Sequence, residues 1–166
     1  MGQESSSEAA ILTYHSLDRS GSVLSISPSL FKEQMQWLAD HKIPVLPLEE
    51  AWKTQGSIAL TFDDGYTNFL EVALPVLDRH GFASTVFVPT GFLGGKNSWQ
   101  DQMRGIPELN TMDRLQTREA FRRGATMGAH GVTHANLSQV SASKAEEELR
   151  RSKEELEQCI GGPVNL

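Results

Sequence analysis

Residues 57–65 read Ser-Ile-Ala-Leu-Thr-Phe-Asp-Asp-Gly, and this stretch indicates the fold class. An apolar run of strand length ends abruptly at two carboxylates and a glycine, as a buried β-strand does at the edge of a sheet. Similar apolar runs alternate with segments of helical periodicity, which predicts parallel strands in an α/β layer or barrel. The expected strands are residues 10–14, 57–62, 83–88 and 125–129, and the expected helices are about 28–41, 67–80, 113–123 and 143–160.

Residues with polar chemistry lie at the C-terminal ends of these expected strands. His15 follows the first strand, Asp63 and Asp64 follow the second, and His130 follows the last. In parallel α/β folds, active sites form at the C-terminal ends of the strands. The coincidence therefore indicates a functional site at that edge of the sheet.

The adjacent carboxylates of Asp63 and Asp64 are the first candidates for chemistry. Two such groups repel each other unless a cation neutralises them. Neighbouring side chains diverge, so each carboxylate can serve a different partner, and Gly65 permits a sharp turn of the backbone. An ordinary Asp-Gly turn with N-capping carboxylates is the alternative, and these residues alone leave both interpretations open.

His130 and His134 are the second candidates. At i and i+4 they are expected on one face of a helical turn, close enough to share a metal ion, although structural roles are the alternative. Position 131 is Gly rather than Glu, so the zinc-protease signature is absent. One carboxylate with both imidazoles would make a three-ligand site with open positions, which is typical of catalytic metals. Non-haem iron oxygenases use this ligand set in a different order along the chain.

The sequence Thr61-Phe-Asp-Asp-Gly65, followed by His130-x-x-x-His134, resembles the first two motifs of the polysaccharide deacetylases. This family is also known as carbohydrate esterase family 4, and its domain as the NodB-homology domain. The resemblance extends from the strand before His15 to the end of the chain. It implies a distorted (β/α) barrel, usually of seven strands, that is incomplete at the C-terminus here. The implied organisation is a disordered N-terminal tail over residues 1–9 and a partial deacetylase domain over residues 10–166.

The resemblance also implies roles for the motif residues. Asp63 would be the general base, and Asp64, His130 and His134 would bind a divalent metal, most naturally zinc, with cobalt or nickel as substitutes. The implied reaction removes N-acetyl groups from an N-acetylglucosamine-containing polysaccharide and releases acetate. The implied partner is an acetylated amino-sugar polymer or oligomer. A catalytically weak carbohydrate-binding fragment and a small-molecule amidohydrolase on the same scaffold are the alternatives.

The chain departs from the family pattern in two respects. Ala129 and Gly131 flank the first histidine, where relatives commonly have Ser before it and Ser or Thr after it, so hydrogen bonds around the ligands are expected to differ. The later family motifs, which supply the oxyanion donor and the general acid, do not occur before residue 166. We therefore expect a truncated barrel whose open strand edges favour self-association, and weak or no deacetylase activity for the chain itself.

His15 and Trp99 are candidates for substrate binding. The Tyr-His strand end at His15 resembles the start of deacetylases that act on β-1,6-linked poly-N-acetylglucosamine, while a strand-end histidine with a local hydrogen bond is the alternative. Trp99 lies in a long expected loop over residues 89–112, and loops of that length are usually functional or mobile. Its indole is suited either to stacking on a sugar ring or to anchoring the loop by packing.

The composition restricts the function classes. The chain has 166 residues, which suits one domain, and its 15 basic against 21 acidic residues give a net charge of −6. This charge argues against a general affinity for nucleic acid or anionic membranes, and no apolar run is long enough to span a bilayer. A single cysteine, Cys159, excludes an internal disulfide. Residues 1–10 lack the pattern of a signal peptide, which leaves open a cytoplasmic protein or a start after a cleaved signal, although the family suggests secretion or the cell envelope.

Overall fold

A parallel four-stranded sheet organises the protein, as the alternation of strands and helices predicts. The computed structural model describes residues 8–100 and 102–166. The expected N-terminal tail therefore lies mostly outside the described residues. The sheet has the order β1-β4-β5-β6, and its strands are β1 (Ala10–Tyr14), β4 (Ile58–Phe62), β5 (Thr85–Val88) and β6 (Thr126–Ala129).

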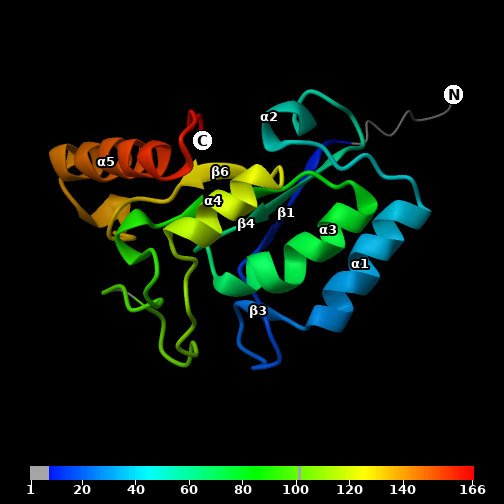
Figure 1. Cartoon of the computed structure of the whole chain (residues 1–166), viewed down its shortest axis with the longest axis horizontal. Helices are drawn as coiled ribbons and strands as arrows, with labels where there is room; N and C mark the ends of the chain where they lie inside the picture. Colours follow the sequence, from blue (N-terminus) through cyan, green and yellow to red (C-terminus); the bar gives the residue numbers. More distant parts are fainter. Residues whose placement is uncertain (1–7, 101) are drawn as a thin grey trace, which may run out of the picture.

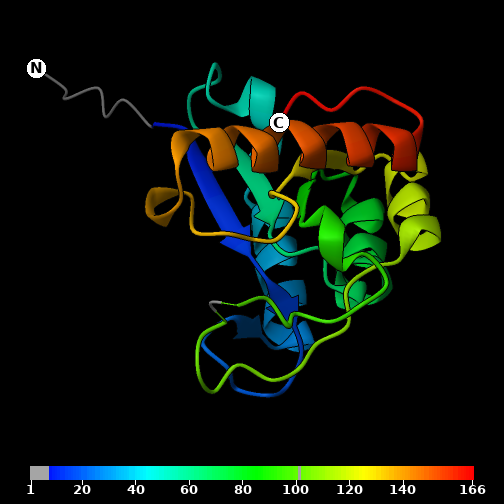
Figure 2. The same cartoon turned by 90° about the vertical axis from the view of Figure 1, so that its left-hand side faces the viewer.

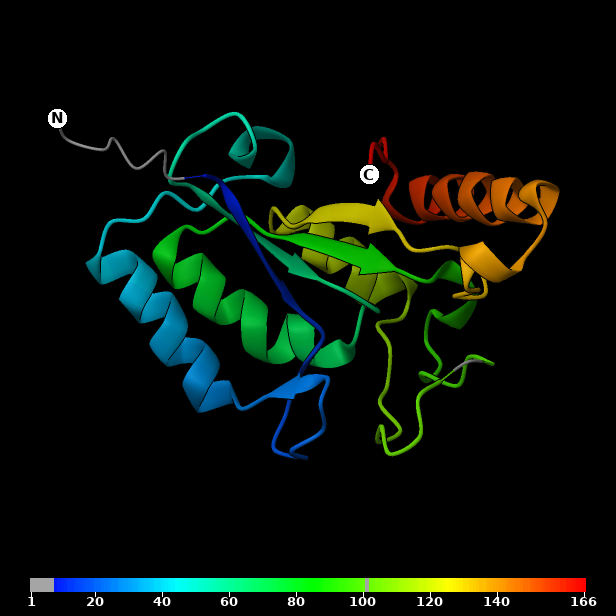
Figure 3. The same cartoon turned by 180° about the vertical axis from the view of Figure 1, so that it is seen from behind.

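Five α-helices accompany this sheet in the described part of the chain. They are α1 (Pro28–Asp40), α2 (Leu48–Ala51), α3 (Leu74–His80), α4 (Arg114–Arg122) and α5 (Ala142–Ile160). Helices α1, α3 and α4 cover one face of the sheet (Figure 1). The opposite face is turned toward the viewer in Figure 3, and among the described residues only the short helix α2 borders it. Helix α5 packs beside α4 and β6 (Figure 2).

The hydrophobic core lies between the sheet and the helices of the covered face. Phe62, the last residue of β4, has its ring centroid 5.9 Å from that of Phe31 in α1 and 4.8 Å from that of Phe69. Phe31, Phe62 and Phe69 are all buried, and burial of a side chain of this kind stabilises a fold by about 1.5–3 kcal/mol. This aromatic packing fixes the strand end from which Asp63 and Asp64 follow.

The helix termini follow from local sequence chemistry, with one correction. The side chain of Ser27 accepts a hydrogen bond from the Leu30 backbone N–H and caps α1, as the Ser-Pro sequence predicts. For α5, a capping box formed by Ser143 and Glu146 is expected from their spacing, but this expectation is wrong. The cap is instead Ser141, two residues earlier, whose side chain accepts the hydrogen bond from the Lys144 N–H, and the helix begins at Ala142.

The segment before α3 departs from a regular helix. A π-helical turn, η1 (Phe69–Ala73), precedes α3, and Pro75 occupies the first turn of α3. Proline has no N–H to donate within a helix, so Pro75 predicts a kink or break in the helix expected over residues 67–80. Gly81 ends α3 in the left-handed conformation with φ 66°, as the sequence predicts.

The remaining short elements lie in segments predicted as loops or extended chain. Residues 16–26 contain the two-stranded sheet formed by β2 (Ser16–Leu17) and β3 (Ser25–Ile26), which the sequence does not predict. Two 3₁₀ turns follow later in the chain, η2 (Thr90–Phe92) and η3 (Leu137–Gln139). Residues 163–166 do not form a strand. The Ala129 N–H of β6 nevertheless donates a hydrogen bond to the Leu166 carbonyl at 2.9 Å.

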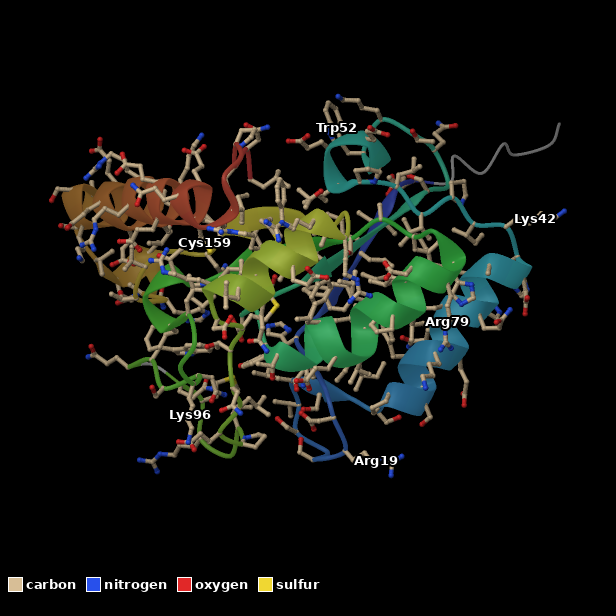
Figure 4. All side chains as sticks on the ribbon, viewed as in Figure 1. Arg19, Lys42, Trp52, Arg79, Lys96 and Cys159 are labelled. Carbon is tan, nitrogen blue, oxygen red and sulfur yellow. The ribbon has the colours of Figure 1, made fainter. Side chains whose placement is uncertain are left out.

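Figure 4 shows the side chains of exposed basic residues together with that of the single cysteine. Arg19 and Lys42 project outward, whereas Cys159 is buried where α5 meets α4. Its backbone carbonyl accepts a hydrogen bond from Nε of Arg118 at 2.9 Å. None of the helices in the described part of the chain combines the length and the apolar character that a membrane span requires.

Candidate metal and catalytic site

The strand ends bring the predicted site residues to one edge of the sheet. Strands β1 and β4 pair with Tyr14 opposite Phe62, and the Asp63 N–H donates to the Tyr14 carbonyl at 2.9 Å. His15 therefore lies beside Asp63, with 3.8 Å between Nε2 and Oδ2. His130 follows β6 in the same way, since its N–H donates to the Val88 carbonyl of β5 at 3.1 Å.

Asp64 occupies an unusual backbone conformation that separates it from Asp63. Its φ is 70° and that of Gly65 is 60°, so two successive residues are left-handed. This conformation costs a residue other than glycine about 1–3 kcal/mol and tends to be found at functional sites. A Cβ at Gly65 would also lie 3.3 Å from Cγ2 of Val88. The turn directs the Asp64 side chain into the protein, where it is buried.

Asp64, His130 and His134 form a compact cluster. One ligand atom from each residue can be chosen so that all lie within 4.8 Å of one another. Oδ1 of Asp64 is 3.2 Å from Nε2 of His134 and 3.7 Å from Nε2 of His130. The ring centroids of the histidines are 4.9 Å apart. The structure therefore brings together the three residues predicted as ligands.

The segment from His130 to His134 is not the helical turn expected from the i and i+4 spacing. Gly131 has a φ of 74° and His134 a φ of 57°, both in the left-handed region, and a right-handed helix excludes such angles. The residue at 131 explains the difference, because glycine enters this region without steric cost. The His130 and His134 rings nevertheless lie close together, because the backbone bends between them rather than forming a helical turn.

Burial and charge give the two aspartates different proton affinities. Burial raises the pKa of Asp63, and the neighbouring Asp64 carboxylate adds to this effect against the opposing influence of His130 and His15. Burial alone would also raise the pKa of Asp64, but the His134 ring and the Tyr66 hydroxyl hold it below its ordinary value. Burial lowers the pKa of His130, which favours the neutral ring that a metal requires.

One buried atom in the cluster shows that its residues fit a cation. Oδ1 of Asp64 has no hydrogen-bond partner among the described residues, although it is buried. An unpaired carboxylate oxygen is costly in such a position, and two imidazole nitrogens face it. A divalent metal would be bound by all three atoms, and one carboxylate with two imidazoles is a donor set suited to zinc.

Tyr66 is a residue of this site that the sequence analysis missed. It is buried, its hydroxyl stabilises the Asp64 carboxylate, and burial raises its own pKa. Nδ2 of Asn97 lies 3.4 Å from the same hydroxyl and ties the long loop to the site. Tyr66 directly follows the Asp-Asp-Gly sequence, and that adjacency is a signal by which it could have been found. Asn97 has no comparable local signal.

Trp99 and His15 both lie at the site, but their contacts differ. The indole of Trp99 stacks on the His134 ring with centroids 4.3 Å apart, and the residue is only 5% exposed. This placement agrees with the alternative in which Trp99 anchors the loop by packing. The stacking of Trp99 on a sugar ring stays a prediction. His15 is partly exposed beside Asp63, and its role in substrate binding also stays a prediction.

Two cavities flank the cluster. One of about 420 Å³ is lined by Asp63 and His130 together with residues of the sheet face that α2 borders, including Thr13 and Phe87. The other, of about 440 Å³, is lined by His134 and bordered by residues 98–100 and 133–136. Of the predicted base and ligands, the first cavity therefore contains Asp63 and His130, and the second contains His134.

Comparisons with known proteins identify the family of this chain. The family model for polysaccharide deacetylase matches residues 51–166. A poly-beta-1,6-N-acetyl-D-glucosamine N-deacetylase of Staphylococcus aureus is 24% identical over 165 residues, covering 86% of this chain and 54% of the relative. The chain spans about half the length of the curated relatives it matches.

Solved structures share the fold. The deacetylase PplD of Streptococcus pyogenes, in complex with acetate, superposes with a TM-score of 0.77 at 24% identity, over 95% of this chain and 71% of the other. A polysaccharide deacetylase of Bacillus cereus gives a TM-score of 0.74 at 28% identity, over 95% and 49%. These likenesses confirm the incomplete (β/α) barrel expected from the sequence. Because the family model covers most of the chain and includes both motifs, this chain belongs to the polysaccharide deacetylase family.

Proposed function

We propose that this chain carries the metal-binding and general-base part of an active site that removes N-acetyl groups from an N-acetylglucosamine-containing polysaccharide. The observation that carries the proposal is the convergence of Asp64, His130 and His134 within 4.8 Å beside Asp63. Family membership supports the deacetylase chemistry. The Staphylococcus aureus relative, named for poly-beta-1,6-N-acetyl-D-glucosamine, supports the substrate class.

Zinc is the proposed metal, with cobalt and nickel as substitutes that the same nitrogen and oxygen ligands accept. When bound, it would polarise a water molecule and the acetamide carbonyl. Asp64 supplies the anionic ligand, because its pKa is held below the ordinary value and its carboxylate stays charged. His130 and His134 would supply the two nitrogen ligands from the same turn.

Asp63 is the proposed general base. Its raised pKa makes the carboxylate a stronger proton acceptor than an ordinary aspartate. The side chain is partly exposed and lines the 420 Å³ cavity next to His130, so an attacking water can reach it. Asp63 takes the proton of that water as the acetamide carbon is attacked. His15, 3.8 Å from Asp63, is placed to contact the sugar or the base.

The substrate is proposed to lie across the cluster, with sugar residues on either side of the acetyl group under attack. The cavities beside Asp63 and beside His134 have similar volumes, about 420 and 440 Å³. The second is bordered by Trp99 and Asn136, an aromatic ring and an amide of the kind that contact sugars. Room for sugar residues next to His130 and next to His134 would suit an internal position in a polymer.

An assay of acetate release with three classes of substrate tests this proposal. The zinc-loaded chain is incubated for long times with β-1,6-linked and β-1,4-linked N-acetylglucosamine oligomers and with small amides. We expect slow release from the sugar oligomers, and a fall of about 10²–10⁴-fold, to background, in Asp63→Asn with zinc still bound.

The other outcomes of this assay would indicate a different function or a different base. Metal binding and oligomer binding without acetate release would indicate a carbohydrate-binding fragment. Faster turnover of small amides would indicate an amidohydrolase on the same scaffold. Equal release by the wild type and Asp63→Asn would remove Asp63 from the role of base.

A further inference from the structure

The turn that carries both histidines is held from outside by a buried carboxylate of α5. Glu148 is 1% exposed. Its Oε2 accepts hydrogen bonds from the backbone N–H of Val132 at 2.8 Å and of Thr133 at 2.7 Å, and its Oε1 accepts one from the Thr133 hydroxyl at 3.0 Å. All three donors belong to the residues between His130 and His134.

The opposite side of the same turn is bonded to η2. The Thr90 N–H donates to the Gly131 carbonyl at 3.1 Å, and the Gly91 N–H donates to the Val132 carbonyl at 2.9 Å. A Cβ at Gly91 would lie 2.6 Å from that Val132 carbonyl oxygen, so only glycine permits the approach. The Val132 and Thr133 N–H groups thus donate to Glu148. The Gly131 and Val132 carbonyls accept hydrogen bonds from the N–H groups of η2.

A carboxylate in this position has a specific physical use. Burial alone would raise its pKa, but the hydrogen bonds from Thr133 and Val132 hold the pKa of Glu148 below its ordinary value, so it stays charged. Lys144 adds a positive charge 3.4 Å from Oε1. Hydrogen bonds to a charged acceptor are about twice as strong as those between neutral groups. Glu148 therefore gives the turn a stronger anchor than a neutral side chain would.

The turn needs such an anchor because it lacks helical hydrogen bonds. Gly131 and His134 are left-handed, with φ of 74° and 57°, and a Cβ at position 131 would lie 3.3 Å from Oε2 of Glu148. If the Val132 and Thr133 N–H groups lost their acceptor, the backbone around His134 would relax toward ordinary angles. That relaxation would move its ring away from Asp64, and metal sites tolerate only small errors in ligand distance.

We propose that Glu148 is a positioning residue for the metal ligands, which acts by fixing the backbone turn between His130 and His134. The inference rests on the proposed metal site and deepens it, since it assigns part of the site's metal affinity to a residue of α5 that is not one of the three proposed ligands. Losses of about 10–100-fold in metal affinity are typical when such supporting hydrogen bonds are removed.

The test compares Glu148→Gln with Glu147→Gln. Glu147 is the preceding residue of α5 and pairs with Lys144 and Arg151 on the exposed side of the helix, so it controls for loss of a charge from α5. Zinc affinity is measured by chelator competition, the visible absorption of the Co²⁺-loaded chain reports ligand geometry, and hydrogen exchange reports the Val132 and Thr133 amides without metal. Circular dichroism establishes that each variant is folded.

We expect Glu148→Gln to bind zinc about 10–100-fold more weakly than the wild type, to change the Co²⁺ spectrum, and to exchange the Val132 and Thr133 amides faster. Glu147→Gln is expected to match the wild type in all three measurements. If Glu148→Gln does not fold, Thr133→Val decides, because it removes only the hydroxyl contact. It should weaken zinc binding by a smaller factor and shift the Co²⁺ spectrum in the same measurement.

Unchanged zinc affinity and an unchanged Co²⁺ spectrum in a folded Glu148→Gln variant, or in Thr133→Val where that variant decides, would overturn the positioning role and leave the site intact. A wild-type chain that bound no zinc would overturn both.

Discussion

The adjacent carboxylates of Asp63 and Asp64 acquire different properties from the backbone that joins them. Asp64 has a left-handed φ of 70° and a buried side chain, whereas Asp63 is partly exposed toward a cavity. The pKa of Asp63 is raised and that of Asp64 is lowered. Pairs of acids whose environments push their pKa values apart commonly divide the chemical roles between them. This division underlies the proposed assignment of base and ligand.

Glu148 leads to a prediction about stability and pH. Its pKa is lower in the folded protein than the ordinary value of 4.5, so its stabilising contribution is present above that value and is lost as the pH falls through the folded pKa. Glu148→Gln should lower the free energy of unfolding by about 1–3 kcal/mol at pH 7, and its deficit relative to the wild type should shrink below pH 4.5.

Urea denaturation of both proteins at neutral and acid pH measures this deficit. Glu147→Gln serves as the control, since an exposed ion pair contributes little to stability. A deficit for Glu148→Gln that stayed constant across the acid range would contradict the assignment of a charged, hydrogen-bonded carboxylate.

The proposed ligands could be predicted from sequence because each belongs to a short local motif at a strand end. Glu148 could not be predicted in this way. It lies 16 residues from Val132 along the chain, and only the packing of α5 beside β6 brings its carboxylate to the turn. Tyr66 is intermediate: its position next to Gly65 is visible in the sequence, but its contact with Asp64 depends on a left-handed turn that the sequence does not specify.

At the scale of elements, the core helices and strands follow the hydrophobic pattern, and the departures have local causes. The bend at residues 130–134 replaces a predicted helical turn because Gly131 takes a left-handed conformation. The N-terminus of α5 moves to Ser141, which competes with Ser143 as a cap. Residues 16–26 form two short strands whose pairing joins residues 9 positions apart, Ser16 with Ser25. Such non-local pairing leaves no periodic signal in so short a segment.

Strand β1 leads to a prediction about self-association. It pairs only with β4 among the described residues, so its other edge is open, and Ile11 on this strand is 58% exposed. Open edges with exposed apolar side chains favour pairing with another chain. We expect the mass measured by light scattering to rise above that of one chain as concentration increases, and Ile11→Lys to reduce this rise.

Leu115→Lys is the matched control. Leu115 is also exposed, at 75%, but lies on α4 rather than on the strand edge, so the same change of charge there should leave association unaltered. A compact monomer at all concentrations would contradict the expectation of self-association.

At the scale of the whole molecule, the fold explains why residues distant in sequence form one site. Parallel strands place their C-terminal ends at one edge, so the segments after β1, β4 and β6 meet there, and the aromatic core beneath β4 holds that edge in place. The sequence predicts this meeting because the strands and their end residues are recognisable. The sequence does not predict which face of the sheet the long helices leave open (Figure 3), because this depends on how the helices distribute over the two faces.

Asp64, His130 and His134 are proposed to bind one metal ion in this chain. Metal stoichiometry of the purified wild type and of Asp64→Asn, measured by elemental analysis after zinc loading and dialysis, tests this site. We expect about one zinc per wild-type chain and a large loss of zinc from Asp64→Asn. No zinc in a folded wild type, or equal zinc in both proteins, would contradict the assignment of this cluster as the metal site.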